Sequence, residues 1–221
     1  MKVAVIANGP MHDHPIYHDL VRGADLIICA DGGANMAMSH GWHPDVLVGD
    51  MDSVAPTILA ELESSGCAVM HHSPRKDETD LELALTEAVK RGATDIVVLG
   101  ATGGRVDHTI ANVMLLSMPV LVGTRVMILA GDTEIALIRD VGRVRGCPGD
   151  TVSLIPICGD ARGVTTEGLE WQLNEGTLAF GYARGVSNVL TAPMASISVR
   201  GGLLLVTHAP VRYPWAPEKA A

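Results

Sequence analysis

The chain has 221 residues, of which 48% are hydrophobic, and it carries 25 acidic against 16 basic residues for a formal net charge of −9. This apolar content predicts a packed core in one large or two modest domains and argues against disorder. Since non-specific nucleic-acid binding needs clustered Lys and Arg, the acidic balance argues against a nucleic-acid partner.

The N-terminal sequence KVAVIANGP contains too short an apolar run for a signal peptide. The most apolar stretch, 113–130, is interrupted by Pro119 and Arg125, so no membrane span is expected. The four cysteines are widely spaced and form no CxxC pair, which argues against a zinc knuckle or a thioredoxin-type site. We therefore expect a soluble, cytoplasmic protein with reduced cysteines.

Residues 1–122 alternate short apolar runs with helical patterns. Five runs are largely apolar throughout, as is typical of strands buried on both faces of a parallel sheet; they are 2–7, 25–30, 45–50, 67–72 and 95–100. Helical patterns occupy 34–41, 56–66 and 79–92, and Thr79 with Glu82 forms a T-x-x-E capping box at the start of the third. The alternation predicts a doubly wound, mostly parallel α/β domain over 1–122.

From residue 123 onward the sequence consists of short segments separated by Gly, Asp or Pro. Several of these segments alternate polar and apolar residues. These segments are 124–131, 133–138, 142–146, 150–157, 161–168, 176–181, 195–200 and 202–208. The pattern favours antiparallel strands, so we expect a small β-sandwich domain over 123–221. The proline-containing tail from Pro210 is expected to be irregular.

Acidic turns follow four consecutive predicted strands. Their carboxylates are Asp31, Asp50, Asp52, Asp77, Asp80 and Asp107. Because ligands of open α/β sheets bind beyond the carboxyl ends of the strands, at least five mutually repelling acids are expected to share one rim. A bound cation would explain their convergence.

Each acid also has a purely structural explanation. A single Asp after a strand is most often a turn residue or a helix cap; Asp80 and Asp107 precede helical patterns, and Asp52 precedes the helix that starts near Pro56. Capping contributes about 1 kcal/mol per site and does not require the carboxylates to converge. Oxygen ligands alone indicate a hard ion, and Mg²⁺ usually lies between carboxylates and substrate phosphates. We interpret the rim as a magnesium and polyphosphate site.

The glycines of this rim fit a phosphate site, because Gly32, Gly33, Gly103 and Gly104 let backbone N–H groups approach a phosphate. Arg105 adds a planar donor for phosphoryl oxygens. There is no Walker A motif, and no GxGxxG follows a strand. The histidine-containing segment NGPMHDHPIYHD is interpreted as a solvated loop, since no second set of zinc ligands with matching spacing occurs.

Six motifs occur in order: DGGAN, GDMDS, KDETD, GATGGRVDH and, in the second half, TTEGLEWQL followed by GVSN. Over about residues 1–206 this set resembles the thiamine pyrophosphokinase family. The resemblance implies transfer of the pyrophosphoryl group of ATP to the hydroxyl of thiamine, giving thiamine diphosphate and AMP. It also implies Mg²⁺, an α/β domain joined to a β-sandwich, and a homodimer with thiamine near the subunit interface.

The resemblance also implies roles for individual residues. Metal and catalytic roles fall on Asp50, Asp52 and Asp80, with Arg105 as a further catalytic residue. Nucleotide-binding roles fall on Asp31, Asp77, Thr79, Gly104, Arg105, Asp107 and His108, and thiamine-binding roles on Trp171, Ser187 and Asn188.

The residues alone leave alternatives open. A Trp face suits the flat, cationic rings of thiamine, but Trp171 in EWQL is equally an inward-facing strand residue, and Ser187 with Asn188 is equally a turn. Three other functions share the acidic rim: a pyrophosphokinase acting on a pterin alcohol, a nucleotide-sensing protein without turnover, and a Mg²⁺-dependent phosphohydrolase.

Overall fold

The computed structural model describes residues 1–11 and 13–210, and the chain forms two compact units, Met1–Gly131 and Asp132–Ala221. We call these unit 1 and unit 2. Every helix among the described residues belongs to unit 1, whereas unit 2 is built of strands. No described helix has the length and apolar character needed to cross a membrane.

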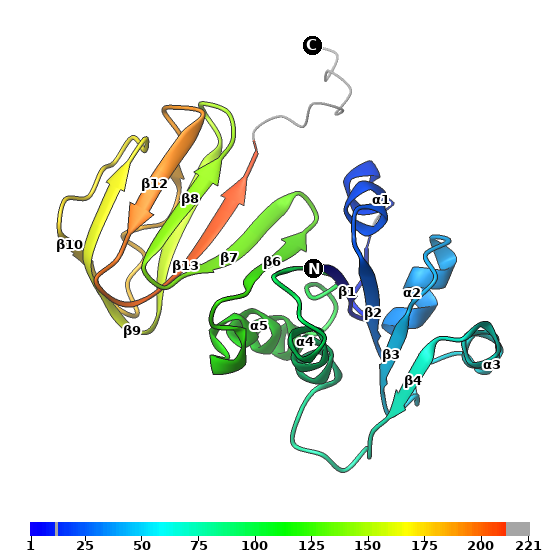
Figure 1. Ribbon diagram of the computed structural model, residues 1–221. Coiled ribbons are helices and arrows are strands. Elements are labelled where there is room, and N and C mark those ends of the chain that lie inside the picture. Colours follow the sequence, from blue (N-terminus) through cyan, green and yellow to red (C-terminus); the bar gives the residue numbers. More distant parts are fainter. Residues whose placement is uncertain (12, 211–221) are drawn as a thin grey trace. The chain divides into compact units, whose positions relative to one another are not determined.

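Unit 1 is a parallel sheet in the strand order β4-β3-β2-β1-β5-β6. Its strands are β1 (Lys2–Ile6), β2 (Leu26–Ala30), β3 (Val46–Gly49), β4 (Ala68–His71), β5 (Asp95–Leu99) and β6 (Arg125–Ala130). Its helices are α1 (Pro15–Arg22), α2 (Gly33–Ser39), α3 (Pro56–Ser65), α4 (Asp80–Lys90) and α5 (Val106–Met114), with short 3₁₀ turns at Leu115–Ser117 and Pro119–Leu121. Within this unit, α1, α2 and α3 cover one face of the sheet, and α4 and α5 lie on the other (Figure 1).

The first five predicted strands and the three predicted helices are confirmed, and local chemistry explains their ends. Thr79 caps α4, because its hydroxyl accepts the N–H of Glu82 at 3.2 Å. The buried stripe of this helix includes Leu81, Leu85 and Ala88. Helix α3 begins at a proline and stops at Gly66, whose left-handed conformation (φ 91°) ends a helix at little cost.

Strand order fixes where a ligand can bind in unit 1. From β1 the chain runs outward through β2, β3 and β4, then returns to place β5 on the other side of β1. Consequently Ile6, at the end of β1, has Cys29 of β2 on one side and Leu99 of β5 on the other. The loops that leave β1 and β5 diverge to opposite faces, and such a reversal point is where open α/β sheets form ligand crevices.

Unit 2 is antiparallel, in the strand order β7-β13-β9-β12-β8 with β10 and β11 also paired to β9. The strands are β7 (Thr133–Ile138), β8 (Val141–Arg145), β9 (Thr151–Glu167), β10 (Gly176–Leu178), β11 (Asn188–Val189), β12 (Met194–Ser198) and β13 (Gly201–Ala209). One apolar core within the unit is shared by these strands and includes Val152, Leu154, Val164, Leu190, Ile197 and Leu204.

Two expectations for the second half need correction. The segment 124–131 was expected to open the second domain, but β6 pairs in parallel with β5, so the chain divides between Gly131 and Asp132. The runs 150–157 and 161–168 were expected to be separate strands, but they form the single strand β9. Cys158 (φ 61°) and Gly159 (φ 119°) bend this strand without ending it.

The loop expected over residues 8–19 is also wrong for its second half, which forms α1. His14 caps this helix by accepting the N–H of Ile16 at 3.2 Å, and Tyr17 is buried. His18 accepts a hydrogen bond of 3.1 Å from the indole N–H of Trp42. His14 and His18 therefore have structural partners. The predicted irregular tail lies outside the described residues, apart from Pro210.

Candidate active site

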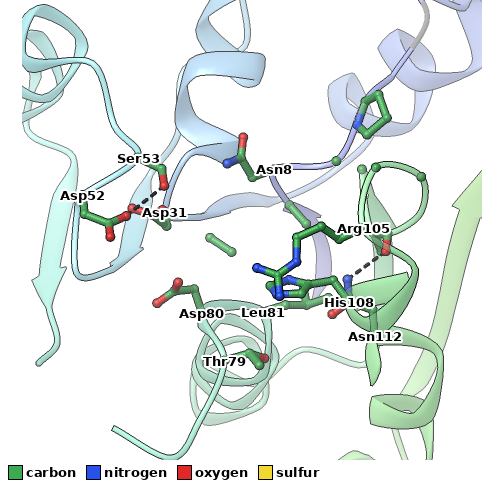
Figure 2. A pocket seen from close by; sticks show the side chains of 18 of the residues that line it. Asn8, Asp31, Asp52, Ser53, Thr79, Asp80, Leu81, Arg105, His108 and Asn112 are labelled. Atoms are coloured by element: carbon green, nitrogen blue, oxygen red, sulfur yellow. Dashed lines mark hydrogen bonds between the residues drawn. The ribbon is translucent and has the colours of Figure 1, made fainter. Parts of the chain in front are cut away.

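A cavity of about 580 Å³ opens at the carboxyl ends of the unit 1 strands, at the reversal point between β1 and β5 (Figure 2). Its walls come from the loops after β1, β2, β3 and β5 and from the start of α4. The lining residues include Asn8, Gly9, Pro10, Asp31, Asp50, Asp52, Ser53, Thr79, Asp80, Gly103, Gly104, Arg105, His108 and Asn112. Most of the predicted nucleotide and metal residues are thus brought together.

Three carboxylates converge in this cavity. Asp31 follows β2, whereas Asp50 and Asp52 follow β3, and one oxygen from each lies within 4.8 Å of the others. Asp31 is only 6% exposed, and its Oδ1 is buried without a hydrogen-bond partner among the described residues. Burial raises the pKa of Asp31, and the negative charges of Asp80 and Asp52 add to that rise. Neutralisation of this carboxylate, by a proton or by a cation, would relieve both effects.

The turn that carries Asp50 and Asp52 has a strained centre. Met51 between them adopts a left-handed conformation (φ 67°), which is uncommon for a residue other than glycine, and its side chain is buried in the core. The N–H of Asp52 donates to Oδ1 of Asp50 at 3.2 Å, and the hydroxyl of Ser53 donates to Oδ1 of Asp52 at 2.8 Å. Local strain of this kind is typical of functional turns.

Asn35 of α2 holds the same turn from behind. Its side-chain amide donates to the carbonyl of Ser53 at 2.7 Å, and its oxygen accepts the N–H of Ala55 at 2.9 Å. Because both amide groups of one side chain are used, the turn is fixed relative to α2.

The capping explanations for the acids are wrong. Helix α3 begins after Ala55, which makes no side-chain capping bond, so Asp52 does not cap it. Helix α4 is capped by Thr79, with Asp80 already inside the helix. Helix α5 begins after Arg105, again without a side-chain cap. Convergence on the cavity is the feature that Asp52 and Asp80 share.

Lys76 is a neighbour of these acids that the sequence did not single out. Its Nζ lies 3.0 Å from Oδ1 of Asp80 and 4.0 Å from Oδ2 of Asp50, and its side chain is only 13% exposed. An isolated lysine in an acidic loop is typical of a solvated surface, so only the fold reveals this contact.

The loops after β1 and β5 pack backbone against backbone. The N–H of Gly9 donates to the carbonyl of Gly100 at 2.7 Å, and a side-chain Cβ at Gly9 would lie 2.3 Å from that oxygen. Gly100 itself has φ 68°. The sequence prediction missed residues 8–10, although the exit of a central strand next to the reversal point marks them as ligand-facing.

Arg105 points its guanidinium into the cavity near His108 (Figure 2). Its Nε and Nη2 bond to the two oxygens of Asp107 at 3.1 and 2.6 Å. This pair lowers the pKa of Asp107 to about 2 and raises the pKa of Arg105. Asp107 thus orients Arg105 from outside the cavity lining, and Asp77 is exposed and also stands outside it.

The predicted thiamine residues lie together in unit 2. Trp171 is 59% exposed and lies outside the strands, so the reading in which it fills the core is wrong. The buried Asn188 accepts the N–H of Trp171 at 3.0 Å and donates to its carbonyl at 2.7 Å. Ser187 has φ 62°, and its N–H donates to the hydroxyl of Ser153 at 3.0 Å. Asn188 therefore fixes the backbone beneath an exposed indole.

Comparisons with known proteins agree with these two units. Residues 17–128 match the family described as thiamin pyrophosphokinase, catalytic domain, and residues 133–204 match the thiamin pyrophosphokinase, vitamin B1 binding domain. Thiamine pyrophosphokinase 1 of Arabidopsis thaliana is 30% identical over 82% of this chain and 77% of its own length. Thiamine pyrophosphokinase of Bacillus subtilis is 26% identical over 92% and 96%.

Solved structures extend the likeness to the fold. The crystal structure of thiamine pyrophosphokinase from Bacillus subtilis superposes with a TM-score of 0.84 at 26% identity, covering 96% of this chain and 100% of that one. The structure of thiamin pyrophosphokinase from Geobacillus thermodenitrificans gives 0.79 at 25% identity, covering 95% and 97%. The motifs, both matched regions and the fold agree, and the chain belongs to the thiamine pyrophosphokinase family.

Proposed function

We propose that this chain is an enzyme that transfers the pyrophosphoryl group of ATP to the hydroxyl of thiamine, giving thiamine diphosphate and AMP. Family membership supports the type of reaction. One structural observation carries the proposal further: Asp31, Asp50 and Asp52 converge at the reversal-point cavity, beside close-packed glycine backbone and Arg105. That arrangement suits a polyphosphate that arrives with a cation.

We propose that Asp31, Asp50 and Asp52 hold a Mg²⁺ ion. All of their donors are oxygens, and Oδ1 of Asp31 is buried with no hydrogen-bond partner in the described part of the chain, so the residues fit a hard cation. The motif match placed Asp80 in this set instead of Asp31; Asp80 lines the same cavity beside Lys76. An ion held there would neutralise charge on the phosphate oxygens.

The nucleotide is proposed to occupy the rest of the cavity. Arg105 would bind a phosphoryl oxygen, because its pair with Asp107 uses Nε and Nη2 and leaves Nη1 as a further donor. Thr79, Gly104 and His108 complete the wall that we assign to ATP. Pyrophosphoryl transfer is largely a problem of positioning and charge, so a guanidinium fixed in advance lowers the barrier.

Thiamine is proposed to bind on unit 2 through the exposed face of Trp171. Stacking and cation–π attraction to such a face contribute about 0.5–2 kcal/mol. Asn188 acts by holding the backbone of Trp171, and Ser187 is part of the same turn. One of the cavity aspartates would accept the proton of the thiamine hydroxyl.

A homodimer with thiamine near the subunit interface is part of the proposal. Helix α5 has no buried residue among its members, and Val106, Ile110 and Met114 form an exposed apolar stripe along it. Exposed apolar stripes of this kind are typical of interaction surfaces. The cytoplasmic location stays a prediction.

Mass-spectrometric product analysis tests the proposed function. The chain is incubated with ATP and Mg²⁺, with either thiamine or a hydroxymethylpterin as acceptor. We expect thiamine diphosphate and AMP in equal amounts, and neither product without thiamine. A pterin diphosphate would identify the rival pyrophosphokinase, and AMP release without any acceptor would identify a phosphohydrolase; both results contradict the proposal.

A further inference from the structure

Lys76 places a positive charge inside the acidic cluster. It belongs to the loop between β4 and α4, and its Nζ lies 3.0 Å from Oδ1 of Asp80 and 4.0 Å from Oδ2 of Asp50; the contact with Asp80 is an ion pair without hydrogen-bond geometry. The side chain of Lys76 is 13% exposed and that of Asp50 is 14% exposed. Lysine is almost never this buried unless it is paired, so the ammonium is held by these carboxylates.

Asp50 is shared between two groups of charges. On one side it belongs with Asp31 and Asp52, the three carboxylates whose oxygens lie within 4.8 Å of one another. On the other side it faces the ammonium of Lys76, which also holds Asp80. The four acids are thus divided into a triad suited to a divalent ion and a fourth acid that the chain itself neutralises.

From this geometry we infer that Lys76 is a built-in cation that occupies a second cation position, between Asp50 and Asp80, and limits the cluster to one divalent ion. The inference rests on the proposed metal site of the triad. In this partly buried setting, the positive charge of the Lys76 ammonium strongly repels any further cation that approaches Asp50 and Asp80. Without Lys76, the negative charges of Asp50 and Asp80 would not be neutralised. A second divalent ion would then bind between their carboxylate oxygens.

Mn²⁺ titration without nucleotide tests the inference, with free Mn²⁺ followed by electron paramagnetic resonance. The proteins are the wild type, Lys76→Gln, Lys76→Met and the conservative Lys76→Arg. Lys90→Gln is a matched control, since it removes the same charge at the far end of α4, about 15 Å along the helix. Circular dichroism of each protein checks that it is folded.

We expect one Mn²⁺ in the wild type, in Lys76→Arg and in Lys90→Gln, and two in Lys76→Gln and Lys76→Met. A merely structural role for Lys76 would weaken metal binding and would not add an ion. One ion in the folded glutamine and methionine variants would overturn the inference. A separate comparison with Asp52→Asn tests the proposed metal site itself. If the wild type binds no Mn²⁺, or if Asp52→Asn binds as much as the wild type, the metal site is wrong, and this outcome is distinct from failure of the inference about Lys76.

Wild-type crystals soaked in Mn²⁺ provide a second measurement that does not depend on any variant folding. We expect one anomalous peak, at Asp31, Asp50 and Asp52, with the ammonium of Lys76 still against Asp80. A second peak between Asp50 and Asp80, with Lys76 displaced, would overturn the inference.

Discussion

Replacing Gly9 by alanine tests the close approach of the two loops that form the nucleotide wall. The added Cβ would lie 2.3 Å from the carbonyl oxygen of Gly100 and 2.8 Å from that of Thr102, and real Cβ atoms essentially never come within 3.0 Å of a neighbour. Both oxygens belong to the backbone, so a side-chain rotation cannot relieve the contact. The loops must separate by at least about 0.7 Å.

The expected magnitude follows from two costs. Overpacking costs about 1–3 kcal/mol, and loss of the 2.7 Å hydrogen bond from Gly9 to Gly100 costs about 1 kcal/mol more. Together they lower Tm by roughly 4–16 °C for a protein of this size. Because a shift of about 1 Å in a positioning group costs up to about 100-fold, we expect kcat/KM for ATP to fall about 10- to 100-fold.

Differential scanning calorimetry and steady-state kinetics measure both effects. The control is Gly201→Ala in unit 2, where an added Cβ meets no atom within 4 Å. It should match the wild type in Tm and in KM for ATP. A Gly9→Ala protein with wild-type Tm and kcat/KM would show that the β1 and β5 loops do not pack as described.

Three further predictions follow from the site and from unit 2. Asp52→Asn removes a charge but little volume at an exposed position, so turnover should be lost while Tm stays within about 2 °C; near-normal activity would contradict the metal role. Trp171→Ala should raise KM for thiamine about 2- to 30-fold and leave KM for ATP unchanged, whereas unchanged values for both would make the indole structural. The carboxylates of Glu134 and Asp150 raise the pKa of His208 above its unfolded value, so the charged imidazole stabilises unit 2 fully below about pH 6.5, and this contribution is lost as the pH rises through the folded pKa. Thermal unfolding of the wild type and His208→Gln should show a difference in Tm that shrinks from pH 6 to pH 9; a constant difference would contradict this origin.

Much of the fold was predictable because its signals are local. Short runs such as KVAVI and DIVVL are apolar enough to identify buried parallel strands, and Thr79 and Gly66 mark the ends of their helices as expected. The place of β6 was not predictable from its own residues, because an apolar six-residue strand suits either kind of sheet. Its pairing with β5 depends on tertiary structure.

Helix α1 was missed for a chemical reason. Its sequence, PIYHDLVR, follows two histidines and a proline that resemble a loop, yet Pro15 is at the start of the helix, where proline is tolerated. The buried Tyr17 and Val21, four residues apart, were the available helical signal.

The length of β9 was missed because glycine was taken to mark a break between two strands. Gly159 only bends the strand, whose pairing with β13 continues beyond it.

The candidate site shows the same division between local and non-local information. The acids could be assigned to one rim because all of them follow parallel strands, but the expectation that at least five would converge was too high. Asp31, Asp50, Asp52 and Asp80 line one cavity, whereas Asp77 and Asp107 lie outside its lining. Which three approach one another was not predictable, since that depends on strand spacing and on the strained turn at Met51. The contacts of Asn35 with the turn after β3 and of Lys76 with Asp50 also join different elements, so they could not be predicted from the local sequence.

The most direct test of the metal and phosphate site is a crystal structure with a non-hydrolysable ATP analogue and Mn²⁺, using the anomalous signal of the ion. We predict an ion bound by oxygens of Asp31, Asp50 and Asp52, with the phosphates between that ion and Arg105. An ion elsewhere, or phosphates outside this cavity with the three carboxylates unbound, would contradict the account.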